Sequence, residues 1–285
     1  MSVSVHPAAA VSATAMIDAT AIVAAGARIG AGVSIGPWCM VGADVEIQDG
    51  AKLISHVVVD GHTIIGPDAE LYPFCTVGLA PQDLKYKGEP TRCVIGARTQ
   101  IREHCSIHRG TATGHGVTRV GDDCLLMAVV HVAHDCAIGN RVVIANNVVM
   151  GGHCQIGDFA VIGGSAALHQ FVRVGRGAMV GGVSGVEADV IPFGSVLGNR
   201  ARLKGLNLIG LKRRGVSRAD MHVLRLAVRA LFWAPGVFAD RVAEVRDSFP
   251  GHPLVDEVLE FVQHGSKRGL IRALKRDATE TDSEG

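Results

Sequence analysis

The stretch ARIGAGVSIGPWCMVGADVEIQDGAKL, residues 27–53, repeats one pattern every six residues. Within it an aliphatic side chain stands at Ile29, Ile35, Val41, Ile47 and Leu53. The same period covers residues 11–77, returns at 95–107, and runs again over 120–186 after a slip of one residue. Neither the 3.6-residue period of a helix nor the alternation of a hairpin sheet fits this spacing. The period therefore predicts short equivalent units that stack on one another.

A second phase of the period carries small side chains, two residues before each aliphatic one. Ala21, Ala27, Ala51 and Ala69 occupy this phase. So do all seven cysteines: Cys39, Cys75, Cys93, Cys105, Cys124, Cys136 and Cys154. We interpret these cysteines as small buried packing residues and not as metal ligands or catalytic thiols. Their odd number and the lack of a C-x-x-C pair also argue against a disulfide framework.

Hexads with these two phases resemble those of the hexapeptide-repeat acyltransferases. The resemblance implies a left-handed parallel β-helix with three short strands per coil; general crossover rules would have given the opposite hand. Residues 18 apart would then stack at about 4.8 Å, the spacing of paired strands. Glycine often follows the aliphatic residue, where we expect turns with positive φ. These positions are Gly30, Gly36, Gly42, Gly66, Gly139, Gly157 and Gly175.

Two polar segments interrupt the period and are predicted to be loops. The first runs from Gly78 to Arg92, and the second, from Arg109 to Arg119, contains three glycines. Loops that leave a rigid scaffold commonly carry functional residues.

The period ends near Pro192, and a helical pattern follows. We predict a β-helix domain over residues 1–196 and a C-terminal α-helical domain over residues 197–285. Ser217 to Asp220 can cap a helix that ends near Pro235. Further amphipathic helices are expected over 239–249 and 254–264, then a short basic helix over 270–275. The acidic end, residues 277–285, is predicted to be disordered.

Composition limits the possible functions. The 285 residues are 48% hydrophobic but only 4% aromatic, and the 36 glycines suit closely stacked small side chains. Nucleic-acid-binding proteins usually show a basic face or an extreme pI. The net charge of this chain is only +1, so no nucleic-acid partner is expected. No segment approaches the roughly 18 unbroken apolar residues of a membrane span, and no secretion signal is recognisable. We therefore predict a cytoplasmic protein.

Four histidines fall within about two predicted coils. Adding 18 to His134 gives Gly152, directly above it in the stack, and adding 18 again gives Gln170. A single histidine is usually a satisfied edge residue, and for His131 alone we favour that interpretation. Yet one corner of the predicted prism collects His131, His134, Gly152, His153, His169 and Gln170.

These residue types suit acyl transfer. Histidine has an ordinary pKa of about 6.5, which fits a general base at neutral pH. Asp135 can orient the tautomer of His134. The backbone N–H of Gly152 is unobstructed and can stabilise an oxyanion.

Three other functions remain open at this point. Three histidines can bind zinc, as in hydratases on similar coils, but here histidines stand beside a stacked glycine and glutamine. A non-catalytic sugar-nucleotide binding module is the second alternative. The third is an N-acyltransferase acting on an amino sugar.

Six motifs, in this order, closely resemble the acyl-carrier-protein–UDP-N-acetylglucosamine O-acyltransferase family of lipid A biosynthesis. They are Gln82–Tyr86, Gly88–Arg92, Ile107–Thr111, His131–Cys136, His169–Phe171 and Gly210–Gly215. The resemblance covers the whole coil and enters the helical tail. It implies an acyl carrier protein as donor, the 3-hydroxyl of UDP-N-acetylglucosamine as acceptor, and a homotrimer. It implies no metal and no cofactor beyond the donor's phosphopantetheine.

The resemblance also assigns roles. His134 would be the general base, Asp135 its support and Gly152 the oxyanion donor, with no acyl-enzyme. The implied substrate-binding residues are Gln82, Asp83, Lys85, His131, His153, His169, Gln170, Asn207, Arg213 and Arg214. Met179 and Gly182 fall in the implied acyl-chain pocket, where Gly182 leaves room for a longer 3-hydroxyacyl chain. Ile209 and Arg200 depart from some members, which carry an acid and a histidine there, so the fine nucleotide contacts stay open.

Overall fold

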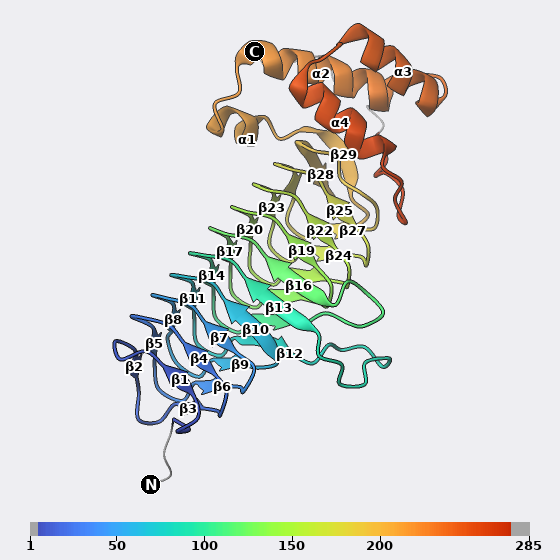
Figure 1. The fold of residues 1–285 in the computed structure, drawn as a ribbon. Coiled ribbons are helices and arrows are strands. Elements are labelled where there is room, and N and C mark those ends of the chain that lie inside the picture. The colour runs from blue at the N-terminus through green and yellow to red at the C-terminus, as the bar shows by residue number, and fades with distance from the viewer. Residues whose placement is uncertain (1–4, 275–285) are drawn as a thin grey trace.

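Each strand pairs in parallel with the strand one coil further on, so the hexads build three sheets around a shared core. The computed structural model describes residues 5–274. Its coils rise as one continuous parallel β-helix from the N-terminal end to a group of helices at the other end (Figure 1). In the regular coils, partners are 18 residues apart, as in the pair Ile29 and Ile47. The predicted stacking interval is thereby confirmed.

The strands follow one another around the prism in a fixed order. The first sheet contains β1 (Ala10–Val11), β4 (Arg28–Ile29), β7 (Glu46–Ile47), β10 (His62–Ile65), β13 (Arg92–Ile95), β16 (Val117–Val120), β19 (Ala137–Ile138), β22 (Gln155–Ile156) and β25 (Arg173–Val174). The second contains β2 (Met16–Ile17), β5 (Ser34–Ile35), β8 (Lys52–Leu53), β11 (Glu70–Leu71), β14 (Gln100–Ile101), β17 (Leu125–Leu126), β20 (Val143–Ile144), β23 (Val161–Ile162), β26 (Met179–Val180), β28 (Gly194–Leu197) and β29 (Arg202–Leu206). The third contains β3 (Ile22–Val23), β6 (Met40–Val41), β9 (Val58–Val59), β12 (Thr76–Leu79), β15 (Ser106–His108), β18 (His131–Val132), β21 (Val149–Met150), β24 (Ala167–Leu168) and β27 (Gly185–Val186).

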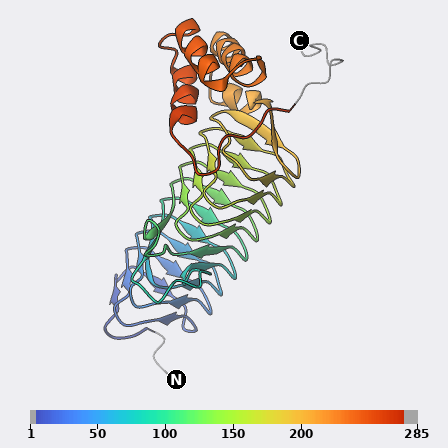
Figure 2. The same ribbon diagram turned by 90° about the vertical axis from the view of Figure 1, so that its right-hand side faces the viewer.

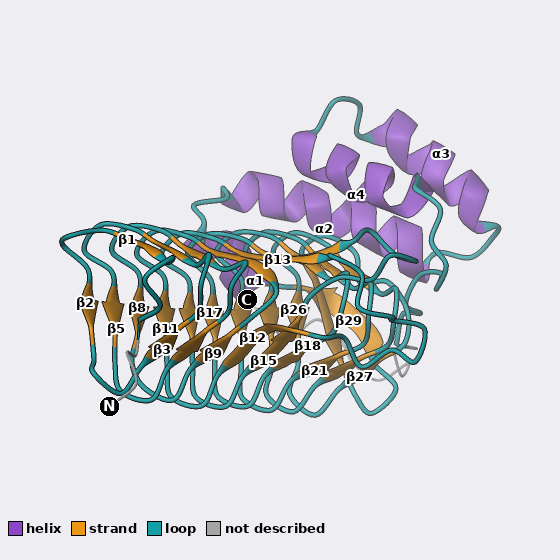
Figure 3. Ribbon diagram, turned by 60° about the horizontal axis from the view of Figure 1, so that its bottom comes forward, coloured by secondary structure: helices purple, strands orange, loops and turns teal. Residues whose placement is uncertain are grey.

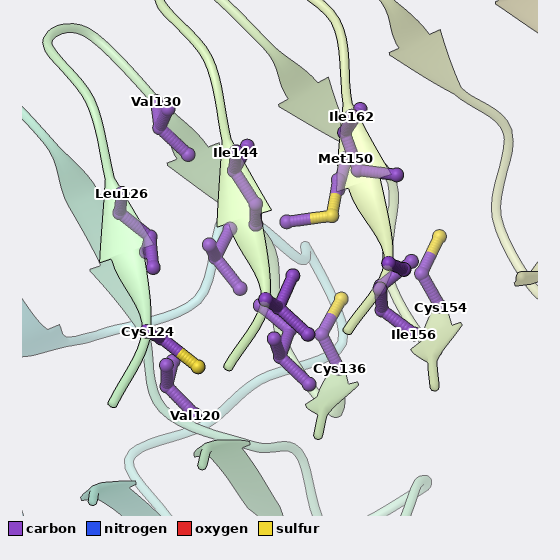
Figure 4. Packing of buried hydrophobic residues seen from close by; sticks show 14 of the residues in the cluster. Val120, Cys124, Leu126, Val130, Cys136, Ile144, Met150, Cys154, Ile156 and Ile162 are labelled. Carbon is purple, nitrogen blue, oxygen red and sulfur yellow. The ribbon is translucent and has the colours of Figure 1, made fainter. Parts of the chain in front are cut away.

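The aliphatic and small phases together fill the core. Every aliphatic position of the period from Val23 onward is buried. Val11 is 36% exposed, because it lies at the N-terminal end of the stack. All seven cysteines are buried and free, and several pack among Leu, Ile and Val side chains (Figure 4). Burial raises the pKa of Cys93 to about 12, so its thiol stays neutral and unreactive.

The glycines after the aliphatic residues do not have positive φ, so that expectation is wrong. Positive φ occurs three residues before the aliphatic position instead, and non-glycine residues such as Trp38 (φ 61°) adopt it there. These glycines are needed for close approach between coils. A Cβ atom built on Gly36 would lie 1.9 Å from the carbonyl oxygen of Ile54 in the next coil. At all seven positions such an atom would come closer than 3.0 Å to a neighbour.

The two interruptions leave the core stacking in register, apart from one irregularity in the pairing of β12 with β15 between Val77 and Leu79. Ile65 pairs with Ile95, and Ile95 pairs with Val120, so each loop adds residues without shifting which side chains face inward. The first loop (80–91) joins β12 to β13, and the second (109–116) joins β15 to β16. Both loops project from the same side of the coil (Figure 1).

Four helices follow the coil: α1 (Leu208–Arg213), α2 (Arg218–Trp233), α3 (Phe238–Ser248) and α4 (Pro253–Gln263). The predicted cap of α2 is confirmed, since the Ser217 hydroxyl accepts a hydrogen bond from the amide of Asp220 at 3.0 Å. Helices α2, α3 and α4 form a separate group beside the strands (Figure 3). The domain division at residue 196 stays a prediction; the second sheet itself continues through antiparallel β29 to Leu206. Among the described residues, no helix is long and apolar enough to cross a membrane.

The segment after α4 is extended, so the predicted basic helix over 270–275 is wrong within the described residues. We call residues 265–274 the C-terminal arm. Ile271 donates its amide to the carbonyl of Asp189 at 2.9 Å, and Leu203 donates to the carbonyl of Arg272 at 3.0 Å. Because Ile271 is 3% exposed, pairing with the coil buries an apolar side chain that a free helix would leave in water. The acidic end, residues 277–285, lies outside the described residues.

Gly36→Ala should destabilise the fold by about 2 kcal/mol, because the new methyl group meets the rigid backbone of the next coil. Gly265→Ala is the matched control, since nothing lies within 4 Å of its Cβ position and its φ is not positive. Thermal unfolding of both variants measures the difference. Equal melting temperatures would contradict the close-approach argument.

Candidate active site

The predicted catalytic residues lie on one edge of the prism, where turns lead from the third sheet to the first. We call it the histidine edge. The turn between β18 and β19 carries His134 and Asp135, and the turn of the next coil carries Gly152 and His153. Both loops leave the coil on this same edge, because each joins a strand of the third sheet to one of the first.

His134 and Gly152 are stacked, as the interval of 18 residues per coil predicts. His153 donates its amide to the carbonyl of His134 at 3.0 Å, which ties the two turns together. A Cβ atom on Gly152 would lie 2.6 Å from Cε1 and 2.7 Å from Nε2 of the His134 ring. Only glycine therefore leaves room for the imidazole at this position.

Asp135 anchors the His134 ring from below. It is 2% exposed and stands at φ 59°, with its amide donated to Thr118 Oγ1 at 2.8 Å. Its carboxylate accepts hydrogen bonds from Thr111 Oγ1 (2.6 Å), the amide of Gly116 (3.0 Å) and His134 Nδ1 (2.8 Å). Burial opposes ionisation, but the hydrogen bonds from Thr111 and His134 outweigh it, and the pKa of Asp135 is lowered.

This network defines the tautomer of His134. An ionised carboxylate can only accept hydrogen bonds, so the proton between the two groups belongs to His134 Nδ1. The lone pair of Nε2 is then free, and His134 is 9% exposed. The arrangement is that of a general base held by a buried acid.

Further histidines surround His134. His153 packs edge-on against His134, with ring centroids 5.1 Å apart. His131 shares a hydrogen bond with Ser106 Oγ at 2.7 Å and contacts His108 edge-on at 5.0 Å. Burial lowers the pKa of His131 and His153, and it lowers that of His108 to about 4. These three rings are therefore neutral at pH 7.

The first loop is bound to the second. Arg109 donates from Nε to the Tyr86 hydroxyl and from Nη1 to the carbonyl of Gly78, both at 2.8 Å. Tyr86 in turn donates to the carbonyl of Glu89 at 2.7 Å. The Asp83 carboxylate accepts from the amide of Lys85 at 2.9 Å, which forms a turn at the loop tip. The exposed residues Gln82 and Lys85 are thus carried by an anchored loop.

The other predicted binding residues lie on different faces of the same chain. Asn207 donates to the carbonyl of Gly177 at 3.0 Å, on the edge between the first and second sheets. The Arg214 guanidinium lies 5.9 Å from the Phe159 ring on that edge, and its buried Nη2 has no partner among the described residues. Burial lowers the pKa of Arg214. The structure therefore does not bring these residues to His134 within one chain.

Three more predicted residues lie away from the histidine edge. Met179 lies in β26 of the second sheet, and Gly182 lies in the turn between the second and third sheets. Arg213 is exposed at the end of α1. His169 and Gln170, by contrast, are exposed on the histidine edge, one coil above Gly152.

Sequence reasoning missed several residues that hold the site. Thr111 and Thr118 bind Asp135, and Ser106 binds His131. The glycines of the second loop were a usable signal that this loop packs closely on the site. A Cβ atom on Gly114 would lie 2.4 Å from the Asp135 carboxylate, which is the group that Thr111 binds. Nothing in the period pointed to Phe171, which stacks on His153 with centroids 4.5 Å apart.

Three side chains at this edge are of types that can bind a metal ion. Ligand atoms of His134, Asp135 and His153 lie within 4.8 Å of one another. Asp135, however, already uses its carboxylate to bind Thr111, Gly116 and His134. The carboxylate is therefore engaged in holding the His134 ring.

Comparison with known proteins agrees with this geometry. Residues 117–152 match the model for bacterial transferase hexapeptide, six repeats, so coil and site together define a hexapeptide-repeat transferase. Residues 189–271 match the second domain of UDP N-acetylglucosamine O-acyltransferase. The chain belongs to the family of acyl-[acyl-carrier-protein]–UDP-N-acetylglucosamine O-acyltransferases. It is 52% identical over 82% of its length to the member from Azorhizobium caulinodans, of which it covers 86%.

Two further matches support the assignment. The family member from Thermodesulfovibrio yellowstonii is 46% identical over 83% of this chain and 91% of its own. A solved UDP-N-acetylglucosamine acyltransferase from Bacteroides fragilis superposes with a TM-score of 0.83 at 33% identity, covering 94% of this chain and all of that one. The predicted left-handed β-helix with C-terminal helices is confirmed.

Asp135→Asn should reduce thermal stability at neutral pH, because the buried carboxylate loses its ionised hydrogen bonds. The pKa of Asp135 in the folded protein is below its ordinary value of 3.8. Its stabilising contribution is therefore complete above about pH 4 and is lost as the pH falls through the folded-state pKa. Melting temperatures between pH 3 and 7 should show the deficit of the variant shrinking at the acid end.

The exposed Asp247→Asn on α3 provides the control and should change the melting temperature little at any pH. A deficit of Asp135→Asn that is the same at every pH would contradict the ionised state assigned to this carboxylate.

Proposed function

We propose that this protein transfers a 3-hydroxyacyl chain from acyl carrier protein to the 3-hydroxyl of UDP-N-acetylglucosamine, the first step of lipid A biosynthesis, in the cytoplasm. The observation that carries the proposal is the buried His134–Asp135 pair directly beneath Gly152. The chain that carries this pair is 52% identical to a relative named acyl-[acyl-carrier-protein]–UDP-N-acetylglucosamine O-acyltransferase.

His134 is the general base in this proposal. Its Nδ1 proton is held by Asp135 at 2.8 Å, so Nε2 accepts the proton of the sugar hydroxyl as that oxygen attacks the thioester. The negative charge of Asp135 stabilises the imidazolium that forms. General-base assistance of this kind contributes roughly 10² to 10⁴ in rate.

Gly152 is the proposed oxyanion donor. Its amide N–H has no hydrogen-bond partner among the described residues, while its carbonyl accepts from the amide of Phe171 at 3.0 Å. An unused donor beside the base can bind the oxygen of the tetrahedral intermediate. The lack of a side chain at Gly152 admits the His134 ring, which lies beside this unused donor.

The reaction is direct and balanced. The sugar oxygen forms the ester bond while the carbon–sulfur bond of the thioester breaks. The proton taken by His134 passes to the departing phosphopantetheine thiolate, which restores the neutral base. No acyl-enzyme, metal ion or additional cofactor takes part, and no cysteine participates because all seven are buried.

The remaining predicted residues bind substrates in this proposal. Gln82, Asp83, Lys85, His131, His153, His169 and Gln170 bind the sugar and the reacting acyl group from the histidine edge. Asn207, Arg213 and Arg214 bind the nucleotide or the donor's phosphopantetheine, and guanidinium groups suit phosphate. The buried Nη2 of Arg214 supports this role, because it offers an unused donor. Met179 and Gly182 border the acyl chain.

The division of these residues supports a homotrimer. Arg214 and His134 lie on different edges of one prism, so one substrate molecule that contacts both needs a second copy of the chain. A rotation about a three-fold axis brings one edge of each prism against a different edge of its neighbour. Each site would then contain the base of one subunit and the arginines of another.

His134→Ala should abolish measurable transfer from 3-hydroxyacyl carrier protein to UDP-N-acetylglucosamine, with a rate loss of roughly 10² to 10⁴. The variant should still fold, because Asp135 keeps its hydrogen bonds with Thr111, Gly116 and Thr118. Product formation is measured by mass spectrometry. Elemental analysis of the same preparation should find no stoichiometric zinc. Retained activity in the variant, or one zinc per chain required for turnover, would refute this mechanism.

Mixed oligomers test the shared site. His134→Ala and Arg214→Ala subunits should each be inactive alone, whereas co-expressed subunits should recover about a quarter of the normal activity. Recovery is expected because some sites then combine an intact base with an intact arginine from a neighbour. Subunits mixed after purification under non-exchanging conditions serve as the control. No recovery in verified mixed oligomers would contradict a site built from two chains.

A further inference from the structure

The C-terminal arm reaches the histidine edge and is held at both ends. At its start, Arg173 donates from Nη2 to the carbonyl of His264 at 3.0 Å and pairs through Nε with Asp189 at 2.6 Å. Further along, Asp189 donates its amide to the carbonyl of Gly269 at 2.8 Å. Figure 2 shows this segment descending from α4 alongside the coil and then crossing it. The residues between these anchors are therefore placed against the edge that carries His134.

A column of stacked groups connects the arm to the base. The Lys267 ammonium lies 4.2 Å above the centre of the Phe171 ring. On its other side, Phe171 stacks on His153 with an interplanar angle of 7° and centroids 4.5 Å apart. His153 then meets His134 edge-on, at an interplanar angle of 89°. Phe171 also donates its amide to the carbonyl of Gly152, so the column adjoins the proposed oxyanion donor.

We propose that Lys267 is a positioning residue for the active site, acting through Phe171 to hold the plane of the His153 ring beside His134. The inference rests on the proposed function, because it concerns the same site. A cation over an aromatic face is attracted by the ring quadrupole, and the flat stack transmits that constraint to the imidazole. Among the aromatic neighbours of His153, Phe171 is the one that stacks face to face, whereas His134 and His115 meet the ring edge-on.

The charges around His153 agree with this role. Burial lowers the pKa of His153, Asp135 acts in the opposite sense, and His134, His115 and Lys267 lower it further. Lys267 therefore favours a neutral ring, which is the form that stacks and that does not compete with His134 for a proton. The neighbouring Arg268 contacts Nδ1 of His169, so the arm touches one predicted substrate-binding histidine directly and reaches His153 through Phe171.

A double-mutant cycle tests the column. Lys267→Met removes the cation and keeps the stem, and Phe171→Leu removes the aromatic stack. Each should lower kcat/KM for acyl transfer about threefold to tenfold with unchanged melting temperature, while Lys267→Arg should retain activity. The double variant should lose no more than Phe171→Leu alone, because both residues act through one column. Arg272→Met, on the exposed side of the arm, is the matched control.

Additive losses, or normal kcat/KM in Lys267→Met, would overturn the proposal. A change confined to the KM for UDP-N-acetylglucosamine would also overturn it, since that result identifies Lys267 as a direct ligand. A second readout does not need turnover. In NMR titrations, with the signal assigned by its loss in His153→Gln, Lys267→Met should raise the pKa of His153 and Arg272→Met should not. An unmodified protein without transfer activity would refute the proposed function, whereas an unshifted His153 pKa would refute this inference alone.

Discussion

The distance between successive coils is the constraint on which the rest of the molecule depends. Parallel pairing brings every turn directly onto the turn below it, at the spacing of two hydrogen-bonded strands. Side chains must then point either into the shared core or outward, and residues such as Gly36 cannot carry a side chain at all. The same closeness shapes the candidate site, because it presses Gly152 against the His134 ring.

Stability and chemistry use different phases of one repeat. Inward positions such as Val132 and Cys136 are fully buried and belong to the core. The residues between them, His134 and Asp135, form the turn and are free to specialise. Asp135 adopts the positive φ that many turns of this coil share, so the turn that carries His134 has the same backbone form as its neighbours. What distinguishes it is the hydrogen-bonding environment supplied by the second loop.

Periodic features could be predicted from the sequence, and non-periodic ones could not. The six-residue repeat was enough to place His134 beneath Gly152, because stacking depends only on counting residues along the chain. The role of glycines such as Gly36 was misjudged, since a one-dimensional pattern does not distinguish a backbone angle from a close approach. The C-terminal arm was also missed. Its pairing with Asp189 and Leu203 joins segments far apart in sequence, and no repeat encodes such contacts.

The two loops show that segments of different length can be inserted at one corner of the coil without changing its stacking register. They differ in length, yet Ile95 and Val120 resume the stack in register after each of them. A loop that starts and ends at one corner costs the scaffold only its closure entropy, which grows slowly with length. Lengthening or shortening these loops can therefore change the surroundings of the histidine edge while the coil remains intact. Such a protein is modular in evolution: new specificity can be acquired at one corner without rebuilding the core.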